Sequence, residues 1–139
     1  MRNPLEIGYR YVIPSLKSHL VRLLNNEYGV YQVDISRMLK MSRSTVSRYI
    51  SMKRGSTIDL TIFSDVNNML KDLANKLIRG ELDKYLLEFE FIRITMYILG
   101  NKYLCGFHAK LDLDVNPNTC MICPKIFGSL KINYSIGNI

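Results

Sequence analysis

The chain has 139 residues, a formal net charge of +7 and a hydrophobic content of 47%, which is sufficient for a core. No apolar run approaches the roughly 18–20 residues of a membrane-spanning helix, and the N-terminal sequence is too polar for a signal peptide. We therefore expect a cytoplasmic protein with no membrane partner. The basic balance favours a polyanionic partner, which fits DNA, RNA or an acidic membrane surface.

The first predicted element is a helix from Pro14 to about Asn25. Leucines recur on its inner side at helical spacing, namely Leu16, Leu20, Leu23 and Leu24. We expect this helix to support the two that follow, and Gly29 to end the unit.

Residues 32–55 predict a helix-turn-helix followed by a basic loop. Five apolar side chains face the supporting helix: Ile35, Leu39, Met41, Val46 and Tyr49. Two short helices that cross steeply would bury this set and leave the outer face of the second helix free. Ser42 is a good N-cap for the second helix. Lys40 holds the turn position that is usually glycine, which would cost about 1 kcal/mol if its backbone is left-handed.

The outer face of the second helix is basic and short-chained. It carries Arg43, Ser44, Thr45, Ser47 and Arg48, and residues 30–55 contain six basic residues against Asp34 alone. Arginine offers a bidentate fork to guanine, and hydroxyls serve phosphates or base edges. Lys53 and Arg54 suit phosphates, and Gln32, at the start of the first helix, completes the predicted contact set. We expect double-stranded DNA as the partner, although a buried helical hairpin would give a similar pattern.

Residues 3–55 resemble the Cro/repressor-type (XRE-like) helix-turn-helix family, and within it a group of small predicted archaeal transcriptional regulators. The resemblance is carried by a similar N-terminal helix, by Tyr28-Gly29 before the motif, by Lys53-Arg54-Gly55 after it, and by a cysteine-rich tail. It implies a sequence-specific DNA-binding regulator that is usually dimeric.

Residues 56–100 predict a helical dimerisation region. Ile62, Val66, Met69, Leu70, Leu73 and Leu77 recur at helical spacing before a stop at Arg79-Gly80. A second helix runs from about Glu81 to Leu99, with heptad spacing of Leu82, Tyr85, Phe89, Ile92, Met96 and Leu99. Further apolar residues widen this arc, as in an internal core stripe. The preceding helix can cover only part of this apolar surface. We interpret the uncovered part as a homodimer interface, which would present two recognition helices to successive major grooves.

Residues 101–139 change in character. Apolar and polar residues alternate over 111–115 and 130–136, which predicts two short strands, with turn residues at 116–118 between them. The predicted fold is therefore mainly α: a helix-turn-helix domain at 1–55, central dimerisation helices at 56–100, and a small β-containing C-terminal metal-binding module at 101–139.

All three cysteines lie in this last region, as Cys105-x2-His108, eleven residues, then Cys120-x2-Cys123. Three thiolates and an imidazole form an established zinc set, and a structural zinc would supply folding energy. An iron–sulfur cluster is the alternative, because Cys123-Pro124 matches the end of ferredoxin-type ligand runs, and a cluster would make the tail a sensor. Three buried cysteines with an unrelated histidine would need no metal. The odd number of cysteines disfavours a disulfide framework.

No Gly-rich phosphate loop and no Ser/His/Asp arrangement is visible, so we do not expect an enzyme. We expect a dimeric transcriptional regulator whose metal site is structural or sensory. The alternative is an adaptor, tethered to DNA, whose metal module recruits transcription or recombination machinery. An RNA-binding module is a weaker third interpretation, because the basic face lacks aromatic residues that would stack on bases.

Overall fold

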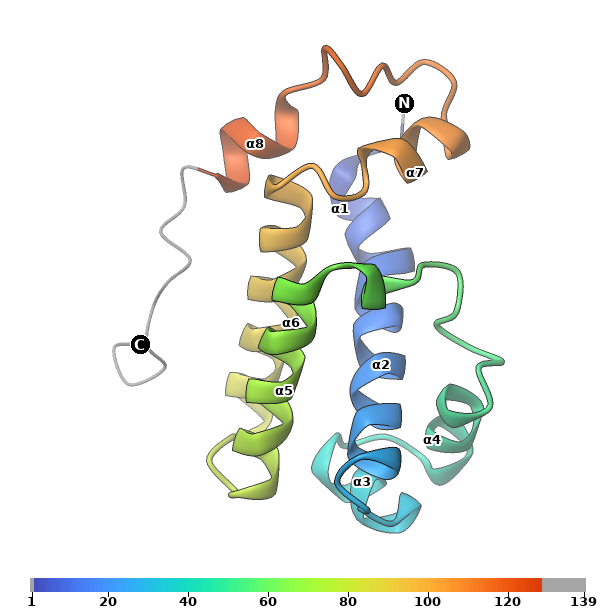
Figure 1. Ribbon diagram of the computed structural model, residues 1–139, viewed down its shortest axis with the longest axis vertical. Helices are drawn as coiled ribbons and strands as arrows, with labels where there is room; N and C mark the ends of the chain where they lie inside the picture. The colour runs from blue at the N-terminus through green and yellow to red at the C-terminus, as the bar shows by residue number, and fades with distance from the viewer. Residues whose placement is uncertain (1, 129–139) are drawn as a thin grey trace.

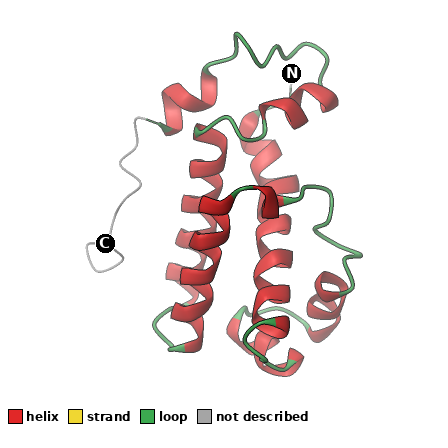
Figure 2. Cartoon of the chain, in the orientation of Figure 1, coloured by secondary structure: helices red, strands yellow, loops and turns green. Residues whose placement is uncertain are grey.

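The computed structural model describes residues 2–128, which form a helical bundle with further short helices at each end (Figure 1). No strand occurs in this part of the chain (Figure 2). The mainly α prediction is therefore confirmed, and the prediction of a β-containing C-terminal module is wrong. None of the helices in residues 2–128 has the length and apolar character that crossing a bilayer requires.

The supporting helix begins earlier than the sequence pattern predicts. Helix α1 (Pro4–Ile7) continues through a π-helical segment (Gly8–Val12) into α2 (Ile13–Asn26). Pro14 has no N–H to donate, and its ring clashes with the carbonyl group four residues earlier in a regular α-helix. A π-helical turn, whose hydrogen bonds span five residues instead of four, ends two residues before this proline. The helix therefore passes through Pro14 instead of starting there.

The helix-turn-helix consists of α3 (Gln32–Met38) and α4 (Arg43–Ile50), which pack against the lower part of α2 in Figure 1. A loop then returns along α2 to a short 3-10 turn (Leu60–Ile62), from which α5 (Ser64–Ile78) begins. The four predicted inner leucines of α2 are all buried in the core. Of the predicted α5 stripe, Ile62 is instead 72% exposed, because it precedes the helix.

Helix α6 (Lys84–Gly100) is capped by Asp83, whose carboxylate accepts the N–H of Leu86 at 2.8 Å. Its buried side consists mainly of Leu87, Phe91, Ile94 and Ile98, which face the rest of the bundle. The predicted heptad stripe lies largely on another side of the helix. Tyr85 and Ile92 are 72% and 51% exposed, Phe89 and Met96 are half-buried, and only Leu99 lies in the core.

The C-terminal region forms two short helices, α7 (Cys105–Leu111) and α8 (Ile122–Phe127), which lie across the upper ends of α1 and α6 (Figure 1). The predicted strand at 111–115 does not exist: Leu111 ends α7, and the following residues form turns. Leu113 is 94% exposed while Val115 is buried, so the alternation reflects turns over a surface and not a pleated strand. The second predicted strand, 130–136, lies outside the described residues.

Candidate DNA-binding surface and candidate metal site

The turn between α3 and α4 has the left-handed residue that a helix-turn-helix needs. Lys40 has φ 54°. The N–H of Met41 donates to the carbonyl of Ser36 at 3.0 Å, and this hydrogen bond closes the C-terminal end of α3. This is the left-handed geometry considered at Lys40 from the sequence. A non-glycine residue here carries a conformational penalty of about 1 kcal/mol.

The N-cap residue of α4, Ser42, engages two hydroxyl groups of the predicted outer face, those of Ser44 and Thr45. Ser42 Oγ accepts the N–H of Thr45 at 3.1 Å and donates to Thr45 Oγ1 at 2.8 Å. Thr45 is half-buried, so its hydroxyl serves the cap. The remaining predicted contact residues of α4 are all exposed: Arg43, Ser44, Ser47 and Arg48. Ser44 Oγ also lies 3.1 Å from Ser42 Oγ, so the cap engages the hydroxyls of Ser44 and Thr45, and the rest of the outer face consists of Arg43, Ser47 and Arg48.

The opposite face of α4 is fixed to the bundle. Val46 is fully buried, Tyr49 nearly so, and the hydroxyl of Ser18 on α2 donates to the carbonyl of Tyr49 at 3.4 Å. On α3, Ile35 and Leu39 are buried as predicted. Because these contacts fix the orientation of α4, its outer face projects as one rigid surface.

The basic loop after α4 is also held in place. The guanidinium of Arg54 lies 5.6 Å from the centre of the Tyr49 ring, a cation–π distance. Gly55 has φ +69°, and a Cβ atom there would lie only 2.4 Å from the carbonyl oxygen of Pro14. Only glycine allows this close approach to α2. Lys53 and Arg54 remain exposed beside α4.

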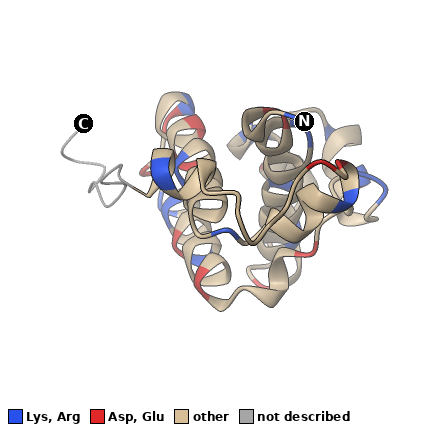
Figure 3. Cartoon of the chain, turned by 90° about the horizontal axis from the view of Figure 1, so that it is seen from above, with Lys and Arg blue, Asp and Glu red and all other residues tan. Residues whose placement is uncertain are grey.

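Several exposed residues at this end were not in the predicted contact set. Arg37 and Lys40 are exposed cations, and Tyr31 is exposed directly before α3. Gln32, which was predicted, is exposed as the first residue of α3. Viewed from above, Lys and Arg are spread over the whole molecule (Figure 3), so the overall charge alone does not indicate which surface binds a polyanion. The local excess of basic residues in 30–55 is the sequence feature that makes the helix-turn-helix end the candidate surface.

The four predicted metal ligands come from the two C-terminal helices and the turn between them. Cys105 and His108 lie one turn apart in α7, Cys123 lies in the first turn of α8, and Cys120 lies just before that helix. The first pair therefore lies on a helical turn, and the second spans the entry into α8; neither lies on the tight turn of a β-like module. Cys105 and His108, three residues apart in α7, have the spacing that directs two side chains to the same side of a helix.

Three of these residues line one small cavity of about 10 Å³, together with apolar side chains from α1 and the end of α6. They are Cys105, His108 and Cys123. His108 is only 7% exposed, and its Nε2 atom has no hydrogen-bond partner. Within residues 2–128, no three His, Cys, Asp or Glu side chains already form a group able to hold a metal ion. The residues are gathered, but their side chains do not converge on one point.

The thiols lie in an environment that disfavours charge. Burial, with the neighbouring Cys105 and Cys120, raises the pKa of the Cys123 thiol to about 11. Burial also raises the pKa of Cys105; the nearby charge of Lys102 opposes this effect in part, and Cys120 adds to it. Without a bound metal ion, both thiols are therefore protonated at neutral pH.

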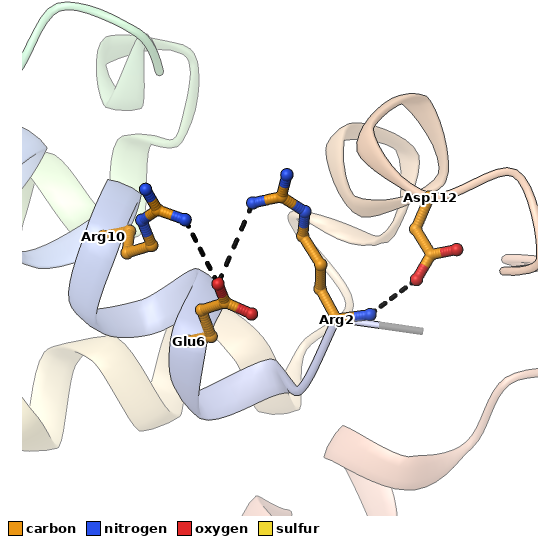
Figure 4. Close-up of polar contacts among 4 residues, drawn as sticks. All are labelled: Arg2, Glu6, Arg10 and Asp112. Carbon is orange, nitrogen blue, oxygen red and sulfur yellow. Dashed lines mark hydrogen bonds and ion pairs between the residues drawn. The ribbon is translucent and has the colours of Figure 1, made fainter.

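The N-terminus is tied to the same end of the molecule. The backbone N–H of Arg2 donates to the carboxylate of Asp112, just after α7, at 2.5 Å (Figure 4). Glu6 on α1 pairs with Arg10 at 3.2 Å and more loosely with the side chain of Arg2 at 3.9 Å. The first and last described segments of the chain therefore meet around the cysteine-lined cavity.

Comparison with known proteins gives no match to a family model, to a curated protein or to a solved structure.

Proposed function

We propose that the protein is a sequence-specific double-stranded DNA-binding regulator that acts as a homodimer. The observation that carries this proposal is the outer face of α4, where Arg43, Ser47 and Arg48 are exposed while the opposite face is locked into the core. A rigid helix with an exposed basic face and a capped N-terminus is suited to enter the major groove. The Cro/repressor-type resemblance of residues 3–55 supports the same proposal.

The side chains of this surface differ in chemistry, and this difference assigns some of them to base readout and others to phosphate contacts. Arg43, in the first turn of α4, is placed to read guanine through its two parallel N–H groups. Lys53 and Arg54, in the loop beside the helix, are suited to phosphates, which contribute affinity but no sequence information. Exposed Arg37 and Lys40 on the same motif would extend the phosphate contacts.

The homodimer is proposed from the exposed stripe on α6. Tyr85, Phe89, Ile92 and Met96 follow each other at intervals of four, three and four residues, and two of them are exposed in the monomer. This is the heptad spacing with which a helix packs along a second copy of itself. A two-fold axis along this stripe would supply the second recognition helix that a palindromic site requires.

Selection of duplexes from a random pool, followed by titration of variants, tests the readout. Arg43→Ala should relax the preference at one base pair and cost about 1–3 kcal/mol on the selected site. Lys53→Ala, the matched control, should weaken binding to every duplex alike and reduce the salt slope by about one. If both variants lose the same affinity on every sequence, the readout role of α4 is wrong.

Analytical ultracentrifugation of Ile92→Asp tests the dimer. A charge on the stripe should convert the dimer to monomer, while the exposed position of Ile92 leaves the core intact. Ile62→Asp places the same change at an exposed isoleucine off the stripe and should leave the dimer unchanged. A dimer that survives Ile92→Asp contradicts the proposed interface.

A further inference from the structure

The cavity at the upper end of the bundle has an unusual combination of linings. Apolar side chains of α1 and α6 form one part of its wall, and two thiols and an imidazole form the rest. A buried polar atom without a partner is destabilising, and most such atoms in native proteins are paired. Nε2 of His108 is such an atom, and it borders the cavity that the thiols of Cys105 and Cys123 also border. The missing partner of His108 is therefore expected inside this cavity.

The chemistry of the lining selects the kind of partner. Thiolates and imidazole are the ligands that zinc prefers, usually four of them in a tetrahedron. A water molecule would need two to four polar partners, and thiols are weak hydrogen-bonding groups. Cys120 is the fourth candidate donor, because it lies three residues before Cys123 and just before α8, although it does not itself line the cavity.

The size of the cavity favours one ion over a cluster. Its volume of about 10 Å³ is close to that of a single water-sized sphere. An iron–sulfur cluster contains several iron and sulfide atoms, so it would require the helices themselves to separate. A single ion requires smaller movements, in which the three lining donors turn inward and Cys120 approaches the edge of the cavity.

We propose that this cavity binds one zinc ion through three thiolates and one imidazole, those of Cys105, Cys120, Cys123 and His108. Each thiol gives its proton to solvent as it binds, so the ion replaces protons and does not change the oxidation state of the protein. Because the cavity wall includes Pro4 and Ile7, the ion joins the C-terminal helices to the start of the long N-terminal helix. The hydrogen bond between Arg2 and Asp112 then closes the same junction from outside. This site is independent of the proposed DNA binding, and either proposal can fail alone.

The test uses the full chain, purified without air, treated with a chelator and then titrated with Co²⁺. We expect saturation at one Co²⁺ per chain, with the strong visible absorption of a tetrahedral thiolate site, and displacement of Co²⁺ by Zn²⁺. Alkylation followed by mass spectrometry provides a second readout: Zn²⁺ should protect all three cysteines together. A brown protein that contains iron and acid-labile sulfide as isolated would overturn the single-ion assignment.

Variants of the four donors test the ligand set. Cys105→Ser, Cys120→Ser, Cys123→Ser and His108→Asn should each weaken Co²⁺ binding by more than the roughly 10–100-fold that loss of an outer contact costs. His19→Asn changes the only other histidine, on α2, and should leave binding unchanged. Circular dichroism of each variant against the chelated wild type identifies any that fail to fold, and the Co²⁺ titration and alkylation of the wild type then decide. Absence of saturable binding, or full-strength binding by His108→Asn, would refute the site.

Discussion

The two ends of the bundle are stabilised by different means. At the helix-turn-helix end, apolar side chains such as Ile35 and Val46 are fully buried, and the turn closes through backbone hydrogen bonds. At the other end, α7 and α8 surround a cavity whose wall includes thiols and the unpaired Nε2 of buried His108. Apolar burial and satisfied hydrogen bonds stabilise the first end, whereas the second contains a polar atom whose desolvation is uncompensated. We therefore expect the first end to depend on packing and the second on a bound ion.

The largest expected effect is loss of packing at the helix-turn-helix end. Ile35→Ala should lower the free energy of unfolding by about 2–5 kcal/mol, because it opens a cavity at a fully buried position. Urea denaturation measures this change. Ile62→Ala, at an exposed isoleucine, is the control and should have little effect. Equal losses in the two variants would mean that α3 does not depend on its apolar face.

Removal of zinc should affect the other end selectively. Zinc at about 100 times its dissociation constant would stabilise the protein by about 2.7 kcal/mol, which chelation would remove. Hydrogen exchange should then become faster in α7, in α8 and at the start of α1, and stay unchanged in α3 and α4. A uniform change along the chain, or no change, would contradict the contrast between the ends.

Gly55 and Gly29 have similar positive φ angles, so their alanine variants distinguish the cost of backbone strain from the cost of a steric clash. Gly55→Ala should destabilise the protein by about 1–3 kcal/mol and weaken DNA binding, because the new Cβ meets the carbonyl of Pro14 at 2.4 Å. Gly29 has φ +65°, but a Cβ atom added there would have no atom within 4 Å. Gly29→Ala should therefore lower the free energy of unfolding by only about 1 kcal/mol. Thermal unfolding of both variants measures the difference. Equal losses would mean that the basic loop is not anchored on α2.

The smallest expected effect lies at the turn. Lys40→Gly should raise the free energy of unfolding by up to about 1 kcal/mol, since glycine adopts φ 54° without penalty. Lys40→Ala removes the same charge but keeps the Cβ atom, so it should give no such gain. If both variants behave alike in urea, the left-handed turn is not a source of strain.

The sequence predicted the helix-turn-helix end well because its signals are local. Helical spacing, the Ser42 cap and a stop at Lys40 each lie within a few residues of the structure they specify. The alternation at 111–115 was misleading, because Leu111 completes a helix and Val115 is buried from a turn. A strand also needs a neighbour with which to pair, and periodicity says nothing about one. Likewise, the cysteine spacing identified candidate ligands, but it could not show that Pro4 and Ile7 complete the wall of their cavity.

The proposal that α4 reads DNA sequence is tested most directly by titrating the full chain with a selected duplex and with a scrambled duplex of equal length, at several salt concentrations. We predict that the selected duplex binds at least about 10³-fold more tightly, with similar salt dependence for both, because phosphate contacts are common to the two complexes. Equal affinity for both duplexes at every salt concentration would contradict the account and leave the exposed face of α4 as a nonspecific basic surface.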